Sequence, residues 1–121
     1  MRRIIALAAC VIFALPVAAQ DALAVSAPGG ELRVLDKLTG EHVDLTLQAG
    51  EKARLGYLHV TMHDCRYLED NPSGEAYINV TVQYRDDPAP IFEGWMLASS
   101  PALNAMDHQR YDVWALRCTI S

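Results

Sequence analysis

A strict alternation of apolar and polar residues runs through "AYINVTVQYRD", residues 76–86, and constrains the fold more than any other feature of the chain. A period of two places successive side chains on opposite faces of a β-strand. The two sets are Ile78, Val80, Val82 and Tyr84 on one face, and Tyr77, Asn79, Thr81 and Gln83 on the other. Shorter stretches of this kind, separated by turn residues, recur along the chain. We therefore expect an all-β fold, a small antiparallel sandwich or barrel of about six or seven strands with one short helix.

Similar local patterns predict the remaining elements. The other strands are expected at residues 31–36, 42–47, 54–65, 91–97 and 110–120. In "KLTGE", Gly40 supplies the positive φ that a hairpin loop needs, so the first two strands should pair antiparallel. The segment "SSPALNAM", residues 99–106, indicates the short helix, capped by Ser99 or Ser100 with Pro101 at its first position.

Strand alternation also predicts which side chains share a face. In the strand at 54–65 one face is expected to hold Leu58, Val60 and Met62. The other face is expected to hold Tyr57, His59, Thr61, His63 and Cys65. In the last strand one face holds Trp114, Leu116, Cys118 and Ile120. This pattern favours Trp114 as a core residue. For Trp95 both core and interface stay open, because Gly94 beside it marks a bulge or the close approach of another chain.

Residues 1–19 have the three parts of a secretory signal peptide. Arg2 and Arg3 precede an apolar run that reaches Leu15 and is followed by a proline and small residues, so cleavage is expected after Ala19. A transmembrane anchor would need roughly 20 apolar residues, more than this run contains. The sequence therefore predicts export to the periplasm.

Removal of the signal peptide leaves one domain. Residues 20–30 are small and end in a proline and a glycine pair, which predicts a flexible lead-in, and residues 31–121 are expected to form a single β domain. Cys10 resembles the cysteine of a lipoprotein signal, but too short an apolar stretch precedes it, and it is expected to leave with the signal peptide.

The charge of the mature chain narrows the range of partners. Loss of two arginines, Arg2 and Arg3, takes the formal net charge from -5 to -7. An acidic protein repels phosphate groups and anionic lipid headgroups. We therefore expect no binding of nucleic acid and no direct binding to a lipid surface.

Cys65 and Cys118 remain in the mature chain. An even number of cysteines in an oxidising compartment predicts a disulfide bond. The bond would connect the end of a central strand to the C-terminal strand, and it would leave no thiolate to bind a metal.

The sequence offers two alternatives, a metal site and a hydrolase site, and supports both less well. On an extended strand the Cα atoms of His59 and His63 would lie roughly 13 Å apart, too far for one zinc ion, so no metal and no other cofactor are expected. A small periplasmic hydrolase would use Ser100, His108 and Asp112, but the Gly-x-Ser-x-Gly elbow is absent and a helix cap explains the serine better. We expect no catalytic residues and no enzyme activity.

The C-terminal block "GWMLASSPALNAMDHQRYDVWALRC", Gly94 to Cys118, resembles an exported proteobacterial family known as domain of unknown function 2155. The resemblance extends to "LDKLTGEHVDL", to the Gly-x-Leu-x-Val segment at Gly56 to Val60, and to Cys65. It implies a small secreted domain with two cysteines and no established activity. It also implies a role near a respiratory complex, because members tend to be encoded near an accessory subunit of NADH dehydrogenase.

These features together predict a periplasmic binding or accessory module, a monomer or an accessory subunit, rather than an enzyme. Its expected partner is another envelope protein, and the resemblance implies one on the periplasmic side of a respiratory complex. The expected interaction surface consists of apolar side chains from one strand and the following helix: Phe92, Trp95, Pro101, Leu103 and Met106.

Overall fold

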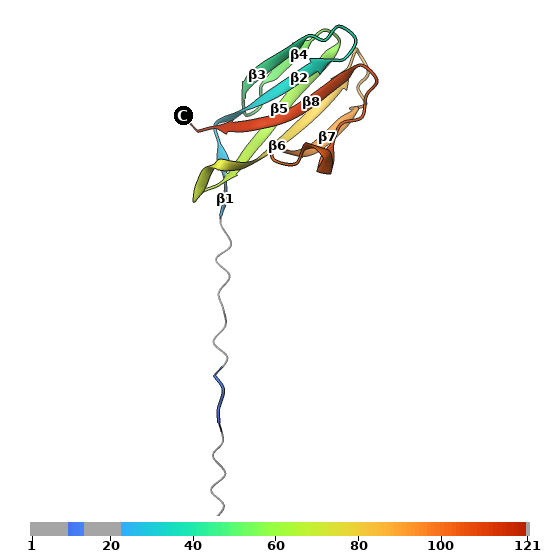
Figure 1. Cartoon of the computed structure of the whole chain (residues 1–121). Coiled ribbons are helices and arrows are strands. Elements are labelled where there is room, and N and C mark those ends of the chain that lie inside the picture. The colour runs from blue at the N-terminus through green and yellow to red at the C-terminus, as the bar shows by residue number, and fades with distance from the viewer. Residues whose placement is uncertain (1–9, 14–22, 121) are drawn as a thin grey trace, which may run out of the picture.

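Two antiparallel β-sheets packed face to face make up the computed structural model, which describes residues 10–13 and 23–120 (Figure 1). The elements are β1 Ala24–Ala27, β2 Gly29–Asp36, β3 His42–Gln48, β4 Lys52–Leu55, β5 Leu58–Leu68, β6 Asn71–Tyr84, β7 Phe92–Leu97, the 3₁₀ helix η1 Pro101–Asn104 and β8 Tyr111–Thr119. The large sheet has the order β1-β5-β6-β7 with β4 paired to β5, and the small sheet has the order β3-β2-β8. The all-β prediction is confirmed, in its sandwich form.

The predicted signal peptide, residues 1–19, and its cleavage after Ala19 lie outside the described residues, apart from residues 10–13. Cys10 is exposed and has a free thiol. In the part of the chain that the structure describes, no helix has both the length and the hydropathy needed to cross a membrane.

The described residues contain eight strands, more than the six or seven expected. One reason is β1, which lies inside the segment 20–30 that was expected to be a flexible lead-in, and β2 already begins at Gly29. β1 pairs antiparallel with the end of β5, where Ala27 is buried opposite Cys65. The lead-in prediction is wrong here because a distant partner strand imposes the extended conformation, and small residues give little local sign of it.

The core lies between the two sheets, and the buried face of β6 confirms the predicted alternation. Ile78, Val80 and Val82 are all 0% exposed. The small sheet contributes Leu32 and Val34 to the same cluster. Burying one such side chain stabilises the fold by about 1.5–3 kcal/mol, so the spacing of these residues fixes which face of each strand points inward.

Leu58, Val60 and Met62 are buried on one face of β5 as predicted, but a bulge after Met62 reverses the predicted faces for the rest of the strand. Met62 pairs with Val80 and Asp64 pairs with Asn79, so His63 is an extra residue without a partner of its own. An extra residue reverses the alternation that follows it. Cys65 therefore lies on the buried side, whereas His63 is exposed.

A second bulge does the same in β8. Ala115 pairs with Leu32 and Arg117 pairs with Glu31, which leaves Leu116 as the extra residue. Val113 and Ala115 are buried, and the prediction of Trp114 as a core residue is wrong. Trp114 is half-buried on the outer face of the small sheet. Beyond the bulge the reversed alternation directs Cys118 toward the large sheet.

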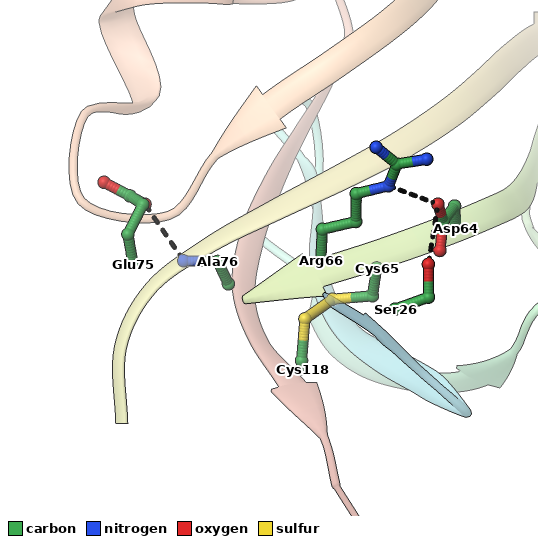
Figure 2. The surroundings of a disulfide bond; sticks show 7 residues. All are labelled: Ser26, Asp64, Cys65, Arg66, Glu75, Ala76 and Cys118. Atoms are coloured by element: carbon green, nitrogen blue, oxygen red, sulfur yellow. Dashed lines mark hydrogen bonds and ion pairs between the residues drawn. A yellow bond between two sulfur atoms is a disulfide. The ribbon is translucent and has the colours of Figure 1, made fainter. Parts of the chain in front are cut away.

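The predicted disulfide between Cys65 and Cys118 is confirmed, with the two Cα atoms 5.7 Å apart (Figure 2). It connects β5 of the large sheet to β8 of the small sheet. Gly30 pairs with Cys118, and a Cβ atom there would lie 3.0 Å from the Cys65 sulfur, tighter than ordinary packing allows. Glycine fits here without displacing its neighbours, whereas a larger residue would push against Cys65 where the two sheets approach the bond.

The predicted helix is reduced to a single 3₁₀ turn, η1, and its predicted cap is wrong. Ser100 precedes η1 but its side chain accepts no capping hydrogen bond. Both the backbone N–H and the hydroxyl of Ser99 donate instead to the Glu75 carboxylate on β6. The carboxylate is a stronger acceptor, and it fixes the chain before η1.

Candidate functional site

Trp95 lies on the outer face of the large sheet. It pairs across β7 and β6 with Asn79, while its neighbour Met96 pairs with Ile78 and is buried. The guanidinium of Arg66 lies 5.3 Å from the centre of the indole ring. The open question about Trp95 is thus answered by strand register, since its half-buried ring is outside the core and stacked under a cation.

A shallow hollow of about 270 Å³ lies beside this ring. It is lined by Ala24, Arg66, Tyr77 and Trp95, which we call the Trp95 surface. The residues come from four different strands of the large sheet. Two aromatic rings and an arginine around an open hollow are the side chains most often found at the centre of protein interfaces.

The position of Arg66 is fixed by a neighbouring carboxylate. Its Nε donates to Oδ2 of Asp64 at 2.9 Å, and the Ser26 hydroxyl donates to the same oxygen at 3.2 Å (Figure 2). Figure 2 shows these three side chains beside the disulfide. The arginine is therefore held in place over Trp95 before any ligand arrives, which reduces the entropy lost on binding.

η1 lies beside β7 at the edge of the large sheet. The Asn104 side-chain amide donates to the Trp95 carbonyl at 2.5 Å. Leu103 is 74% exposed, and Pro101 is exposed as well. η1 thus presents apolar side chains to solvent close to β7.

Two residues of the predicted interaction surface belong to the core. Met106 is only 6% exposed. Phe92 pairs with the buried Val82 and packs against the core cluster. Phe92 and Trp95 are an odd number of residues apart, so they point to opposite faces of β7. Of the five residues of the predicted interaction surface, Trp95, Pro101 and Leu103 therefore lie outside the core. Phe92 and Met106 do not.

The residues of the hydrolase alternative are not arranged as a catalytic triad. The Nδ1 atom of His108 accepts hydrogen bonds from the backbone N–H groups of Arg110 and Tyr111, so it has no proton to donate to Asp112. The Asp112 carboxylate accepts from the N–H of Val113. Among residues 23–120 no hydrogen bond joins Ser100 to His108, and the geometry that such a triad requires is absent there.

The two histidines of "HVTMHDC" have separate surroundings. The Nε2 atom of His63 lies 2.7 Å from the Thr81 hydroxyl. His59, earlier on β5, pairs with Gln83 of β6. Cys65 is in the disulfide and cannot act as a thiolate ligand. Within residues 10–13 and 23–120, no three His, Cys, Asp or Glu side chains are grouped so that they would hold a metal ion.

A second cluster, not predicted from the sequence, lies at one end of the sandwich. The Arg85 guanidinium lies 4.9 Å from the Tyr57 ring centre, and the Arg110 guanidinium lies 5.5 Å from it. The Tyr84 ring packs 4.6 Å from that of His108, measured between ring centres. These residues come from three separate segments, and only the local pair Gly56-Tyr57, a glycine before an aromatic residue, marks the place in the sequence.

Asp36 organises one side of this cluster. Its two carboxylate oxygens share the single N–H of Arg110 Nε, at 3.2 and 3.3 Å, and one of them also accepts from Nη2 at 3.0 Å. The N–H of Leu38 donates to the carboxylate at 3.0 Å. The hydrogen bonds from Arg110 hold the pKa of Asp36 below its ordinary value. The carboxylate therefore stays ionised, and Arg110 is neutralised within the fold.

Tyr111 closes the cluster from the core side. Its side chain is 0% exposed, and its hydroxyl accepts a hydrogen bond from the Tyr57 N–H at 3.2 Å. Gly56 has a φ of +56°, and a Cβ atom there would lie 2.5 Å from the Tyr111 hydroxyl oxygen. Both the conformation and the close approach therefore require glycine at this turn.

Comparison with known proteins identifies a family and no activity. The model of a family described as "Uncharacterized protein conserved in bacteria (DUF2155)" matches residues 30–118. The chain is also 30% identical over 92 residues to an uncharacterized protein of Rickettsia prowazekii (strain Madrid E), a match that covers 74% of this chain and 59% of that relative. No solved structure matches significantly. Because the match runs from β2 to β8 and takes in both cysteines of the disulfide, the chain belongs to the DUF2155 family.

Proposed function

We propose that this protein is an exported periplasmic module, without enzymatic activity of its own, that binds another envelope protein. The observation that carries the proposal is the Trp95 surface, where an aromatic ring lies outside the core with Arg66 stacked on it and a hollow of about 270 Å³ beside it. A half-buried tryptophan outside the core leaves part of its apolar ring in contact with water, and a bound partner would bury that part.

The chemistry of the surface favours a partner that inserts an apolar side chain. The rings of Tyr77 and Trp95 and the methyl group of Ala24 offer it apolar walls. Arg66 is already paired with Asp64, so the hollow brings little net charge to the contact. Such a pocket, ringed by polar groups that exclude water, provides most of the binding energy of a typical interface.

The periplasmic part of the proposal rests on residues 1–19, whose charged start, apolar run and small-residue end are those of a signal peptide. The disulfide is in keeping with an oxidising compartment. The genomic context of the family favours a partner in or near a respiratory complex, and the identity of the captured protein would test that part separately.

The test is affinity capture from solubilised envelope, with Trp95→Ala compared with Trp114→Ala. Both tryptophans are half-buried on the outer face of a sheet, so the pair differs mainly in which sheet carries the change. Truncating a central interface residue costs about 2 kcal/mol or more, which is roughly a thirtyfold loss of affinity. We expect a partner retained by the wild type and by Trp114→Ala to be lost with Trp95→Ala.

Equal capture by all three proteins would contradict the proposed surface. Loss with Trp114→Ala alone would place the interface on the small sheet instead. Thermal melts of both variants are the control for folding, so that lost capture from a folded variant reports the surface and not unfolding.

A further inference from the structure

Among residues 23–120, the cations whose side chains have neither a carboxylate nor a carbonyl partner gather in one place. Within residues 23–120, four arginines form ion pairs with carboxylates: Arg33, Arg66, Arg110 and Arg117. Lys37 donates to the carbonyl of His108. The cations that remain unpaired in this part of the chain are Lys52, Arg54 and Arg85. All three lie where β4, β5 and β6 meet, although the protein as a whole has a net charge of -5.

Strand register brings these side chains onto one surface. Arg54 pairs with His59 across β4 and β5, and His59 pairs with Gln83 of β6. Directly paired residues point to the same face, so Arg54 and His59 share the outer face of the large sheet. Lys52 belongs to the same outer set, two residues before Arg54 on β4.

Arg85 is turned toward this surface by an unusual backbone conformation. It follows the end of β6 with a φ of +57°, and its N–H donates to the Tyr57 carbonyl at 2.7 Å. Its guanidinium lies over the rings of Tyr57 and Tyr84, at 4.9 Å and 5.2 Å from their centres. The guanidinium is thus held in place, while its charge is not neutralised by a carboxylate.

The side chains surround a hollow of about 630 Å³. Its lining is Arg54, Gly56, Tyr57, His59, Arg85 and Asp86. A smaller hollow of about 190 Å³, which Lys52 lines, shares His59, Arg85 and Asp86 with it. We call this region, Lys52, Arg54, Tyr57, His59 and Arg85, the cationic corner.

We propose that the cationic corner binds a compact anion through a carboxylate or phosphate group. Two guanidinium groups and an imidazole offer the planar and charge-assisted donors that such groups accept. The Tyr57 ring, in a residue 51% exposed, offers an apolar face beside them. Asp86 in the lining and the acidic remainder of the protein repel extended polyanions, so the ligand presents its charge at one point.

This site is separate from the Trp95 surface. The two hollows have no lining residue in common, and the Trp95 surface includes β1 and β7, which the cationic corner does not use. Binding of an anion and capture of an envelope partner can therefore succeed or fail independently.

The test is an NMR titration of the periplasmic protein with inorganic phosphate and, separately, with succinate, at a constant ionic strength of about 0.15 M. We expect saturable shifts of the Tyr57 and Arg85 backbone amides and of the Arg54 and Arg85 Nε–H signals, with either or both anions. Saturation with phosphate alone assigns a phosphate ligand, with succinate alone a carboxylate, and with both a site that accepts either group.

Arg85→Asn and Arg54→Gln should each weaken binding about tenfold, since each removes charged hydrogen bonds. Asparagine tolerates a positive φ, so Arg85→Asn should remain folded, and Arg54→Gln changes an exposed strand residue without altering the turn. Arg33→Gln is the matched control, because Arg33 is paired with Asp44 on the small sheet. Absence of saturation with both anions, unchanged affinity in both corner variants, or an equal loss with Arg33→Gln would overturn the proposal.

Discussion

Replacement of both bonded cysteines, Cys65→Ala with Cys118→Ala, is expected to lower the free energy of unfolding by about 4 kcal/mol. The bond closes a loop with a sequence separation of 53 residues, and removing it restores the conformational freedom of that loop to the unfolded chain. Alanine is the appropriate replacement because Cys65 is 0% exposed and serine would bury a hydroxyl group. For a domain with about 5–15 kcal/mol in total, this is a large share.

Urea unfolding with and without reductant measures this effect. The wild type should lose a similar free energy of unfolding when reductant is added, whereas the double variant should be insensitive to reductant. A change below about 1 kcal/mol in both comparisons would mean that the bond between the sheets adds little to the packed core.

The substitution Tyr111→Ala is expected to cost about 4 kcal/mol of stability. Tyr111 is 0% exposed and is the largest of the fully buried side chains. It lies between the sheets at the end of the sandwich that carries Tyr57, and its removal leaves a cavity there. The N–H of Tyr57 also loses its acceptor.

Tyr111→Phe separates the two contributions, because it removes only the hydroxyl group and its hydrogen bond. The expected cost is about 1 kcal/mol. Denaturant unfolding of the two variants should therefore give values that differ by about 3 kcal/mol. Equal values would show that the hydrogen bond to Tyr57, and not the packing of the ring, dominates at this position.

The sequence predicted correctly those parts of the fold that do not depend on pairing between distant strands. The alternation through β6 gave its buried and exposed faces correctly, because that strand is regular between Ala76 and Tyr84. The disulfide prediction followed from the predicted signal peptide and the cysteine count, without any knowledge of geometry. The alternation depends on one segment alone, and the disulfide prediction depends on a property of the whole chain. Neither requires the pairing of distant strands.

The errors arose where pairing with distant strands decides the structure. The bulges at His63 and Leu116 depend on the registers of β6 and β2, and the sequences of β5 and β8 contain no glycine to mark them. Both bulges reverse the alternation before a cysteine, so Cys65 and Cys118 can meet in the core. The same reversal is why Trp114 was misplaced.

The candidate surfaces show the same difference between what a local pattern predicts and what distant strands decide. Trp95 was recognised as a residue that could contact a partner, but its neighbours Arg66 and Tyr77 come from other strands and were not predicted. The cationic corner was missed altogether, because Arg54 and Arg85 are 31 positions apart in the sequence numbering and meet only through β5. Ionic groups on separate strands leave no local pattern.

Photo-crosslinking in living cells tests the central claim most directly. A benzophenone amino acid in place of Tyr77 lies in the Trp95 surface, and the same amino acid in place of Leu38, which is 76% exposed in the turn between β2 and β3, serves as the control. The account predicts a discrete crosslinked adduct with an envelope protein from position 77, abolished by Trp95→Ala, and none from position 38. No adduct from position 77, or the same adduct from both positions, would contradict it.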